Sequence, residues 1–332
     1  MAEPNFSIEV PVTTGAGPRT PLLISKYPRV IRAVANTPWA ILPEKLHAIL
    51  DFLAFKAQGG AVTPELIAAL QQTAPAPGLR SGGMIGVLSL FGLISHRANM
   101  LNDISGGTST EKFASQLRQL LADPQVKSIV IDVDSPGGTA EGVMELSDEI
   151  FGAREQKKIV AVANATAASA AYWIASAATE FAVIPSGLVG SIGIFGVHID
   201  ESKLEEKIGI KTTLVSAGKY KTEGDSSLPL SEEARTAMQA LVDEFYEMFV
   251  KTVARNRGVE VSAVREGFGE GRLVTARQAV KLGMVDRVAT LEESLTRLGA
   301  GRNRSVSPLA EGTDPLDELE LKRRRFNLSH PV

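Results

Sequence analysis

The sequence predicts an α/β fold built from parallel βα units. Short apolar runs alternate along the chain with amphipathic segments of helical length, which is the pattern of strands joined by crossover helices. The composition agrees, because 30 glycines, 44% hydrophobic residues and only 5% aromatic residues favour α/β packing over a helical bundle. A chain of 332 residues is long enough for one large domain or two.

The N-terminal part, residues 1–80, is expected to be a flexible leader followed by a helical segment. Residues 1–27 are rich in Pro, Thr and Gly. Between residues 29 and 70 the apolar side chains recur at helical spacing. Two short stretches there, 36–39 and 42–44, have the composition of helix starts.

The main domain is expected at residues 81–299. It follows a Pro- and Gly-rich linker at 73–83 and precedes a tail, 300–332, in which an acidic block adjoins a basic one, as in solvated, disordered tails. Strands are predicted at residues 85–90, 126–133, 159–163, 181–184, 192–199 and 212–216, with a short extended piece at 271–274. Helices are predicted at residues 110–122, 140–153, 167–178, 231–256 and 275–282.

The composition excludes several kinds of chemistry. The chain has no cysteine, so it has no disulfide, no thiolate nucleophile and no cysteine-based metal site. No metal or other cofactor is expected, because a three-histidine site would need nearly all of four scattered residues: His47, His96, His198 and His330. A formal net charge of −3 predicts no general affinity for nucleic acid or anionic membranes.

No segment indicates export or a membrane anchor. Residues 1–10 lack the basic and then apolar pattern of a secretory leader. The stretch between Lys158 and Glu180 is uncharged and long enough to span a bilayer, but alanines dominate it and polar residues interrupt it. A buried strand followed by a tightly packed helix explains this stretch, and the protein is expected in the cytoplasm.

Four short motifs are candidates for chemistry. Residues 134–138 (DSPGG) follow a predicted strand, and glycine N–H groups at a helix start can hold an oxyanion. Ser169 lies among alanines at residues 167–172, at the beginning of a predicted helix. Residues 190–193 (GSIG) form a tight turn, and residues 216–221 (SAGKYK) end a predicted strand. Taken singly, each has an ordinary explanation as a turn, a helix cap or a solvated charge.

In this order the four motifs resemble the signal peptide peptidase A family of serine peptidases, over residues 84–298. The resemblance implies a Clp-protease/crotonase-like fold of repeated ββα units. It also implies a Ser–Lys dyad in which Ser169 is the nucleophile and Lys221 the general base. Ser191 is implied to orient the lysine amine, and the oxyanion is implied to bind backbone N–H groups of Gly137 or Gly138 and of Ala170.

This assignment is chemically consistent. A serine hydroxyl needs an adjacent base, and lysine serves as one only where burial lowers its pKa. Lys219 is a rival base, since alternation along a strand points Lys219 and Lys221 to the same side; the motif alignment favours Lys221. A histidine base at His198, 29 residues after Ser169, is the less favoured alternative, because that residue lies in a predicted strand.

One departure from the family concerns the residues after the nucleophile. Family members commonly have glycines there, whereas this chain has Ala170 and Ala171 before Tyr172 and Trp173. The two added methyl groups are expected to narrow the site, which bears on the range of substrates more than on the chemistry.

The helical N-terminal segment, around residues 27–46, looks like the leader of phage and prophage head-maturation proteases of the same family. This subgroup implies cleavage of capsid or scaffold proteins inside proheads in the host cytoplasm, by a homo-oligomer with its sites near subunit contacts. Whether Ser169 and Lys221 meet within one subunit or across two stays open. The alternatives are a cytoplasmic signal-peptide-peptidase-like protease, a catalytically silent assembly scaffold, and an acyl-CoA enzyme of the crotonase type.

Overall fold

The computed structural model describes residues 37–57, 78–80, 84–97 and 107–300. The expected leader at 1–27 and the expected tail beyond residue 300 lie outside these residues. Among the described helices, none is both long enough and apolar enough to cross a membrane.

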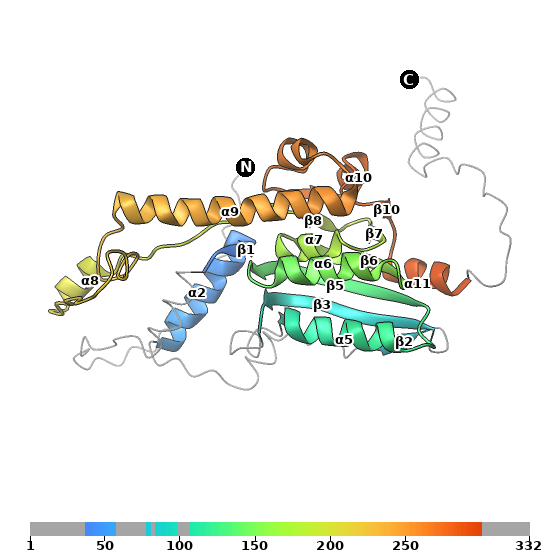
Figure 1. The fold of residues 1–332 in the computed structure, drawn as a ribbon, viewed down its shortest axis with the longest axis horizontal. Coiled ribbons are helices and arrows are strands. Elements are labelled where there is room, and N and C mark those ends of the chain that lie inside the picture. Colours follow the sequence, from blue (N-terminus) through green and yellow to red (C-terminus); the bar gives the residue numbers. More distant parts are fainter. Residues whose placement is uncertain (1–36, 58–77, 81–83, 98–106, 301–332) are drawn as a thin grey trace, which may run out of the picture.

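The centre of the molecule is a mostly parallel sheet, which confirms the predicted α/β class (Figure 1). Its main path has the order β10-β7-β6-β5-β3-β2, and all neighbours except β2 pair in parallel. In chain order these strands are β2 (Gly78–Arg80), β3 (Ile85–Ser95), β5 (Ser128–Thr139), β6 (Lys158–Ala168), β7 (Glu180–Val183) and β10 (Arg287–Val288).

Four short strands extend the sheet where the long parallel strands end. The last residues of β3, β5 and β6 pair with β4, β1 and β8 respectively, and β9 pairs with β8. Their bounds are β1 (Trp39–Ile41), β4 (Thr108–Ser109), β8 (Leu188–Gly190) and β9 (Leu273–Thr275). Backbone segments from distant parts of the chain therefore converge at the carboxyl edge of the sheet, where α/β proteins bind ligands.

Helices cover both faces of the sheet because its central strands are apolar on both sides (Figure 1). The main core lies under α5 (Thr110–Ala122), α6 (Val143–Ala153), α7 (Ala170–Ala175) and α9 (Glu232–Arg257). A second core on the other face packs beneath α11 (Leu291–Ala300). The remaining helices are α2 (Pro43–Ala57), α8 (Ser202–Lys207), α10 (Ala276–Lys281) and a π-helical turn at Ala263–Gly267.

The helix ends that a local capping residue defines lie where the sequence predicts them. Helix α5 has the predicted bounds, and its cap residue Ser109 accepts a hydrogen bond from the N–H of Lys112 at 3.3 Å. Ser231 caps α9 in the same way, accepting from the N–H of Ala234 at 3.1 Å. Helix α2 starts at Pro43, a residue suited to the first turn.

Four predictions about the chain's local structure are wrong. The predicted strand at 212–216 does not form, because residues 211–216 are exposed with no strand beside them. The predicted strand at 192–199 is reduced to one bridge at Phe195. The helix start predicted at 36–39 is instead the beginning of β1, since Trp39 pairs with the end of β5. The helix predicted at 167–178 is shorter, because β6 continues as far as Ala168 and α7 begins only at Ala170.

Residues 200–231, here called the arm, leave the body of the molecule. The arm contains α8 and projects beyond the first turn of α9, away from the sheet (Figure 1). Most of its side chains are exposed. The arm closes on itself through the N–H of Glu201, which donates to the carbonyl of Ser226 at 2.7 Å.

Candidate active site

Ser169 is the single residue between β6 and α7, and its backbone is strained. Its φ is 53° and its ψ is −117°, a combination that L-residues rarely adopt and that costs of order 1–3 kcal/mol. The turn is held by the N–H of Ser169, which donates to the carbonyl of Gly190 at 2.7 Å. A serine on a sharp, strained strand-to-helix turn is the arrangement that serine hydrolases use to present a nucleophile.

Helix α7 is anchored firmly enough to hold this strain. Its two large side chains are fully buried, and the ring of Trp173 stacks on Phe249 of α9 with centroids 4.3 Å apart. The hydroxyl of Tyr172 donates to the carbonyl of Met284 at 2.9 Å, and burial raises the pKa of this phenol. These contacts fix the helix that begins next to Ser169, so the alanine-rich sequence serves close packing as expected.

Ser191 lies beside Ser169 because two parallel strands end together. Ala168 of β6 is aligned with Gly190 of β8, and each serine is the next residue in its chain segment. Ser191 also has a positive φ of 54°, and its N–H donates to the carbonyl of Arg272 at 2.9 Å. Its side chain is nearly buried. The two serines predicted to share the site are therefore neighbours at one edge of the sheet.

The glycine pair at the end of β5 packs against the same turn. Gly137 has a φ of 99°, and a Cβ built on it would lie 2.2 Å from the Ala40 carbonyl oxygen and 3.1 Å from that of Ala168. A Cβ on Gly138 would lie 1.7 Å from the carbonyl oxygen of Ile94. Both positions need glycine because backbone atoms lie where a side chain would begin.

Two of the expected oxyanion donors, Gly137 and Gly138, have partners within the chain. The N–H of Gly137 donates to the hydroxyl of Ser135 at 3.1 Å, and Gly138 is in register with Ala40 of β1. Ala170 is the first residue of α7, so its N–H has no carbonyl acceptor within that helix. The structure thus brings Gly137, Ser169, Ala170 and Ser191 into one region.

The lysines expected as bases are not part of this region within one chain. Lys221 lies in the exposed arm, and its side chain makes no hydrogen bond or ion pair with another described residue. Lys219, also in the arm, bonds to Glu233 at 2.9 Å and to the hydroxyl of Tyr220 at 2.6 Å. These bonds, the one to Tyr220 first, raise the pKa of Lys219, which is the opposite of what a general base needs.

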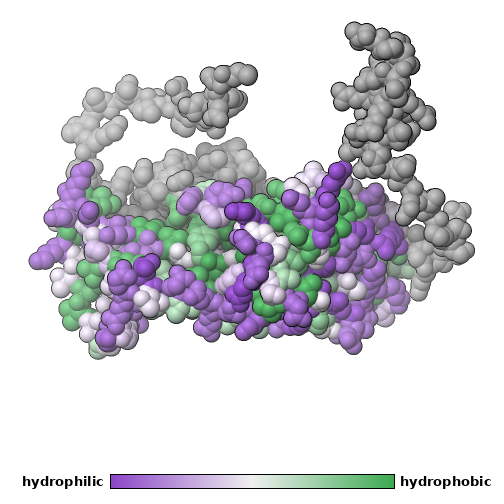
Figure 2. Space-filling model, turned by 90° about the horizontal axis from the view of Figure 1, so that it is seen from above, coloured by the Kyte–Doolittle hydropathy of each residue, from purple (hydrophilic) through white to green (hydrophobic). Residues whose placement is uncertain are grey.

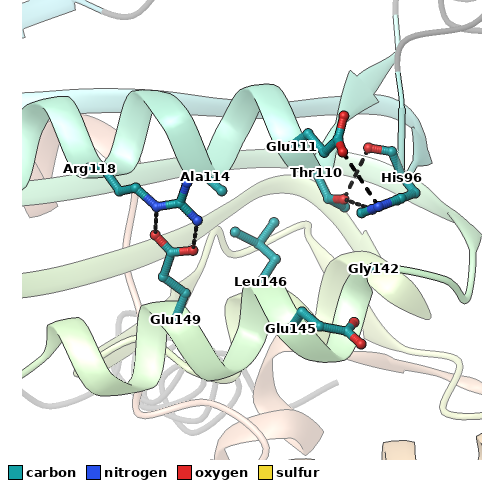
Figure 3. Close-up of a pocket in the computed structure, with 9 residues that line it drawn as sticks. All are labelled: His96, Thr110, Glu111, Ala114, Arg118, Gly142, Glu145, Leu146 and Glu149. Carbon is teal, nitrogen blue, oxygen red and sulfur yellow. Dashed lines mark hydrogen bonds and ion pairs between the residues drawn. The ribbon is translucent and has the colours of Figure 1, made fainter.

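The pocket that contains His96 is separate from the region around Ser169. His96 lines a polar pocket between α5 and α6, where its Nδ1 is 3.1 Å from the hydroxyl oxygen of Thr110 (Figure 3). The ion pair between Arg118 and Glu149 bridges α5 and α6 at the end of this pocket away from His96 (Figure 3), and none of the expected site residues line the pocket. Within the described ranges, no cluster of three acidic or histidine residues is arranged to hold a metal ion.

Sequence reasoning missed a buried carboxyl group, Asp132, on β5. Burial raises its pKa to about 6, with smaller effects of the Asn164 hydrogen bond and the nearby Asp134. The sequence contained an indication of this buried group, because Asp132 interrupts the apolar run at residues 129–133. β1 was also missed: its partner strand lies about a hundred residues further along the chain, and only tertiary structure reveals the pairing.

Comparison with known proteins places this geometry in a family. The model of Peptidase family S49 matches residues 152–304, which include Ser169, Ser191 and Lys221. The "Head-tail preconnector protein GP5" of Enterobacteria phage P21 is 31% identical over 222 residues, covering 67% of this chain and 44% of that protein. The "Capsid assembly protease C" of Escherichia phage lambda is 29% identical over 228 residues, covering 69% of this chain and 52% of that protein.

A third relative is matched over most of its own length. The protein named "Putative protease" from Synechocystis sp. is 30% identical over 214 residues, which are 64% of this chain and 73% of that protein. By contrast, the chain spans about half the length of the two phage proteins. The mostly parallel α/β fold is of the Clp-protease/crotonase type, and together these findings show that the chain belongs to Peptidase family S49.

Proposed function

We propose that the protein is a serine endopeptidase in which Ser169 attacks the scissile carbonyl. The observation that carries the proposal is the strained turn at Ser169, which lies against Gly137 and directly beside Ser191. A buried helix sequence maintains this strain, and strain of this kind concentrates at functional residues. The chemistry is acyl transfer: the Ser169 oxygen bonds to the carbonyl carbon, the amine leaves, and water then hydrolyses the ester.

Backbone donors next to Ser169 would stabilise the charge that develops on the carbonyl oxygen. Gly137 lacks a side chain where the backbone of Ala168 approaches, Gly138 is the next residue of β5, and Ala170 contributes an N–H at the start of α7. Fixed N–H donors of this kind contribute roughly 10²–10³-fold to the rate each. We propose Gly137 or Gly138, together with Ala170, as the oxyanion donors.

The general base is proposed to be Lys221 of a neighbouring copy. Its neutral amine would take the Ser169 proton and return it to the leaving amine, while Ser191 would orient it. Lys221 is exposed in the projecting arm of its own chain, whereas Ser169 is fully buried at the sheet edge. The pKa of a lysine is lowered only where its amine is buried away from water. Docking of the arm against another copy would bury the Lys221 amine in this way.

The arm has the apolar surface that such docking needs. It exposes large apolar side chains that a single chain leaves in water: Leu204, Ile208, Leu214, Val215, Tyr220 and Leu228. Figure 2 shows green apolar side chains among purple ones at the end of the molecule formed by the arm. Val215 is the most exposed of these side chains, at 95%. Exposed apolar side chains that gather on one part of a surface mark interaction surfaces. A homo-oligomer follows from this proposal.

The substrates are proposed to be capsid or scaffold proteins, cut during phage head assembly in the host cytoplasm. The names of the two phage relatives, a capsid assembly protease and a head-tail preconnector protein, support this choice. A bacterial signal-peptide-peptidase-like protease is the second candidate, supported by the relative named "Putative signal peptide peptidase SppA" from Enterococcus faecium. Ala170 and Ala171 beside the nucleophile favour small residues at the cleavage point.

The test is incubation of purified protein with casein and with the capsid and scaffold proteins of the same phage or prophage. Ser169→Ala should abolish cleavage, and a fluorophosphonate probe should label Ser169 in the wild type only. Ser294→Ala, which removes a buried hydroxyl from α11 on the other face of the sheet, serves as the matched control and should stay active. Equal cleavage by wild type and Ser169→Ala would refute the mechanism; cleavage of signal peptides in preference to capsid proteins would favour the second candidate.

A further inference from the structure

Strand β1 lies in a slot between two backbone segments that flank Ser169. On one side Trp39 exchanges two hydrogen bonds with Phe195: its N–H donates to the Phe195 carbonyl at 2.9 Å, and the Phe195 N–H donates back at 3.1 Å. On the other side β1 runs antiparallel to the last residues of β5. Figure 1 shows β1 and α2 at this end of the sheet. An extended segment bonded along both edges is bound as a peptide is bound by strand addition.

The β5 side of the slot engages the glycines proposed to hold the oxyanion. The N–H of Ala140 donates to the Pro38 carbonyl at 3.1 Å, and the N–H of Leu42 donates to the Pro136 carbonyl at 3.0 Å. Hydrogen-bonded pairs alternate in an antiparallel ladder, so the pair between these two, Ala40 with Gly138, is also bonded. β1 therefore takes up the backbone hydrogen-bonding groups of Gly138.

The Phe195 side of the slot is just as close to the nucleophile. The hydroxyl of Ser169 lies 3.4 Å from the carbonyl oxygen of Gly193, two residues before Phe195. The Ala40 carbonyl oxygen and the Ala168 carbonyl oxygen both lie against Gly137. β1 thus passes next to the turn that carries Ser169, and Ser169 itself is 0% exposed. A substrate cannot reach this serine while the surrounding elements stay in place.

Apolar contacts hold β1 in the slot. Trp39 and Ile41 are buried together with Leu46 of α2 and Leu93 of β3. Ala40 points to the other side, where it is part of the main core. Helix α2 therefore packs over β1 through this shared cluster.

We propose that β1 is a built-in competitor for the substrate strand, which must leave the slot before a protein chain is cleaved. The proposal rests on the proposed role of Ser169. A substrate in this slot pairs with the same two edges in extended form, with a small residue where Ala40 lies and bulky apolar residues where Trp39 and Ile41 lie. The N-terminal segment of the chain then keeps the enzyme inactive until another chain displaces it.

The test is a reversible disulfide bond that holds β1 in the slot of the full-length chain. Trp39 and Thr139 are directly opposite each other and fall between the bonded pairs. The Cα atoms of such a pair lie about 4.5 Å apart, within the roughly 4.4–6.8 Å that a disulfide spans. The protein has no cysteine, so the double variant Trp39→Cys/Thr139→Cys forms only this bond. Its oxidised form should cleave casein more than about tenfold more slowly than its reduced form.

Two further variants keep the result unambiguous. Trp39→Cys alone, treated with the same oxidant, should show no redox effect. Trp39→Ala, which loosens β1, should cleave faster than wild type; circular dichroism checks that it is folded. A locked form as fast as the reduced form, or a folded Trp39→Ala that is slower than wild type, overturns the competitor role. Loss of all cleavage and of fluorophosphonate labelling in wild type and reduced protein alike would instead overturn the proposed function.

Discussion

Ser169 and Ser191 each follow one member of the aligned pair Ala168 and Gly190, and both have a positive φ, 53° and 54°. Two non-glycine residues with a positive φ at adjacent strand ends are strained. Packing elsewhere in the fold must offset the free-energy cost of this strain. The carbonyl of Gly190 and the N–H of Ser169 join the two turns at 2.7 Å. The backbone of one turn is therefore held against that of the other.

Ser191→Ala should reduce kcat far more than it raises KM, because Ser191 is proposed to orient the lysine amine rather than to bind substrate. We expect a loss of roughly 10–100-fold, a part of what general base catalysis contributes. The rising limb of the pH–rate profile should move to higher pH. Ser191→Gly separates the hydroxyl from the strain, since glycine accepts a φ of 54°. If Ser191→Gly is as active as wild type, the hydroxyl has no positioning role.

Lys221→Ala should lose roughly 10²–10⁴-fold in kcat/KM, the contribution of a general base. Lys219→Ala is the matched control two residues away. It removes an ion pair with Glu233 in which the lysine side chain is 69% exposed, and exposed pairs of this kind contribute little to stability. Steady-state kinetics on casein compares the two variants. An inactive Lys219→Ala beside an active Lys221→Ala would reassign the base.

Co-expression of Ser169→Ala and Lys221→Ala chains should restore activity that neither has alone. If the dyad forms between copies, a site works when its serine comes from one variant and its lysine from the other. Random assembly of equal amounts gives about one quarter of intact sites. Activity and oligomer size are measured on the same purified sample. Mixed oligomers without activity would show that serine and lysine meet within one chain.

The parts of the fold that local chemistry determines were predictable from the sequence. Helix α5 and the start of α9 are defined by an amphipathic pattern and a serine cap, and both are found where predicted. The glycines and serines of the site follow strand ends, so the parallel βα pattern brings Gly137, Ser169 and Ser191 to one edge. Parallel strands place consecutive carboxyl ends together, which makes such a site predictable.

The features that depend on distant partners were not predictable. The apolar stretch at 212–216 resembles a strand, but Val215 is exposed in the arm and has no neighbouring strand in a single chain. β1 reads locally as a helix start, and its pairing with residues 137–139 is a tertiary contact. The same holds for the position of Lys221 in the exposed arm, since motif order contains no information on where the arm lies relative to Ser169.

Gly138→Ala should destabilise the fold, because its Cβ would lie 1.7 Å from the backbone oxygen of Ile94, which cannot move without disturbing β3. We expect a loss of about 2 kcal/mol or more in the free energy of unfolding. Gly152→Ala in α6 is the control: nothing lies within 4 Å of its Cβ, and alanine favours a helix by roughly 0.5–1 kcal/mol. Thermal unfolding should therefore shift in opposite directions for the two variants, and an unchanged melting temperature for Gly138→Ala would contradict the packing around the glycine pair.

Asp132→Asn should stabilise the protein at neutral pH and lose this benefit in acid. Burial raises the pKa of Asp132 from 3.8 to about 6, so between these values the folded state holds a proton that the unfolded chain has released. The free energy of unfolding therefore falls as pH rises through this window, and above it the buried charge remains as a penalty. Asparagine keeps the shape without the charge, so the gain in melting temperature over wild type should grow from about pH 4 to about pH 6 and then level off. A gain that is constant with pH would mean that the Asp132 carboxyl has the same pKa in the folded and unfolded states, which would contradict the effect of its burial.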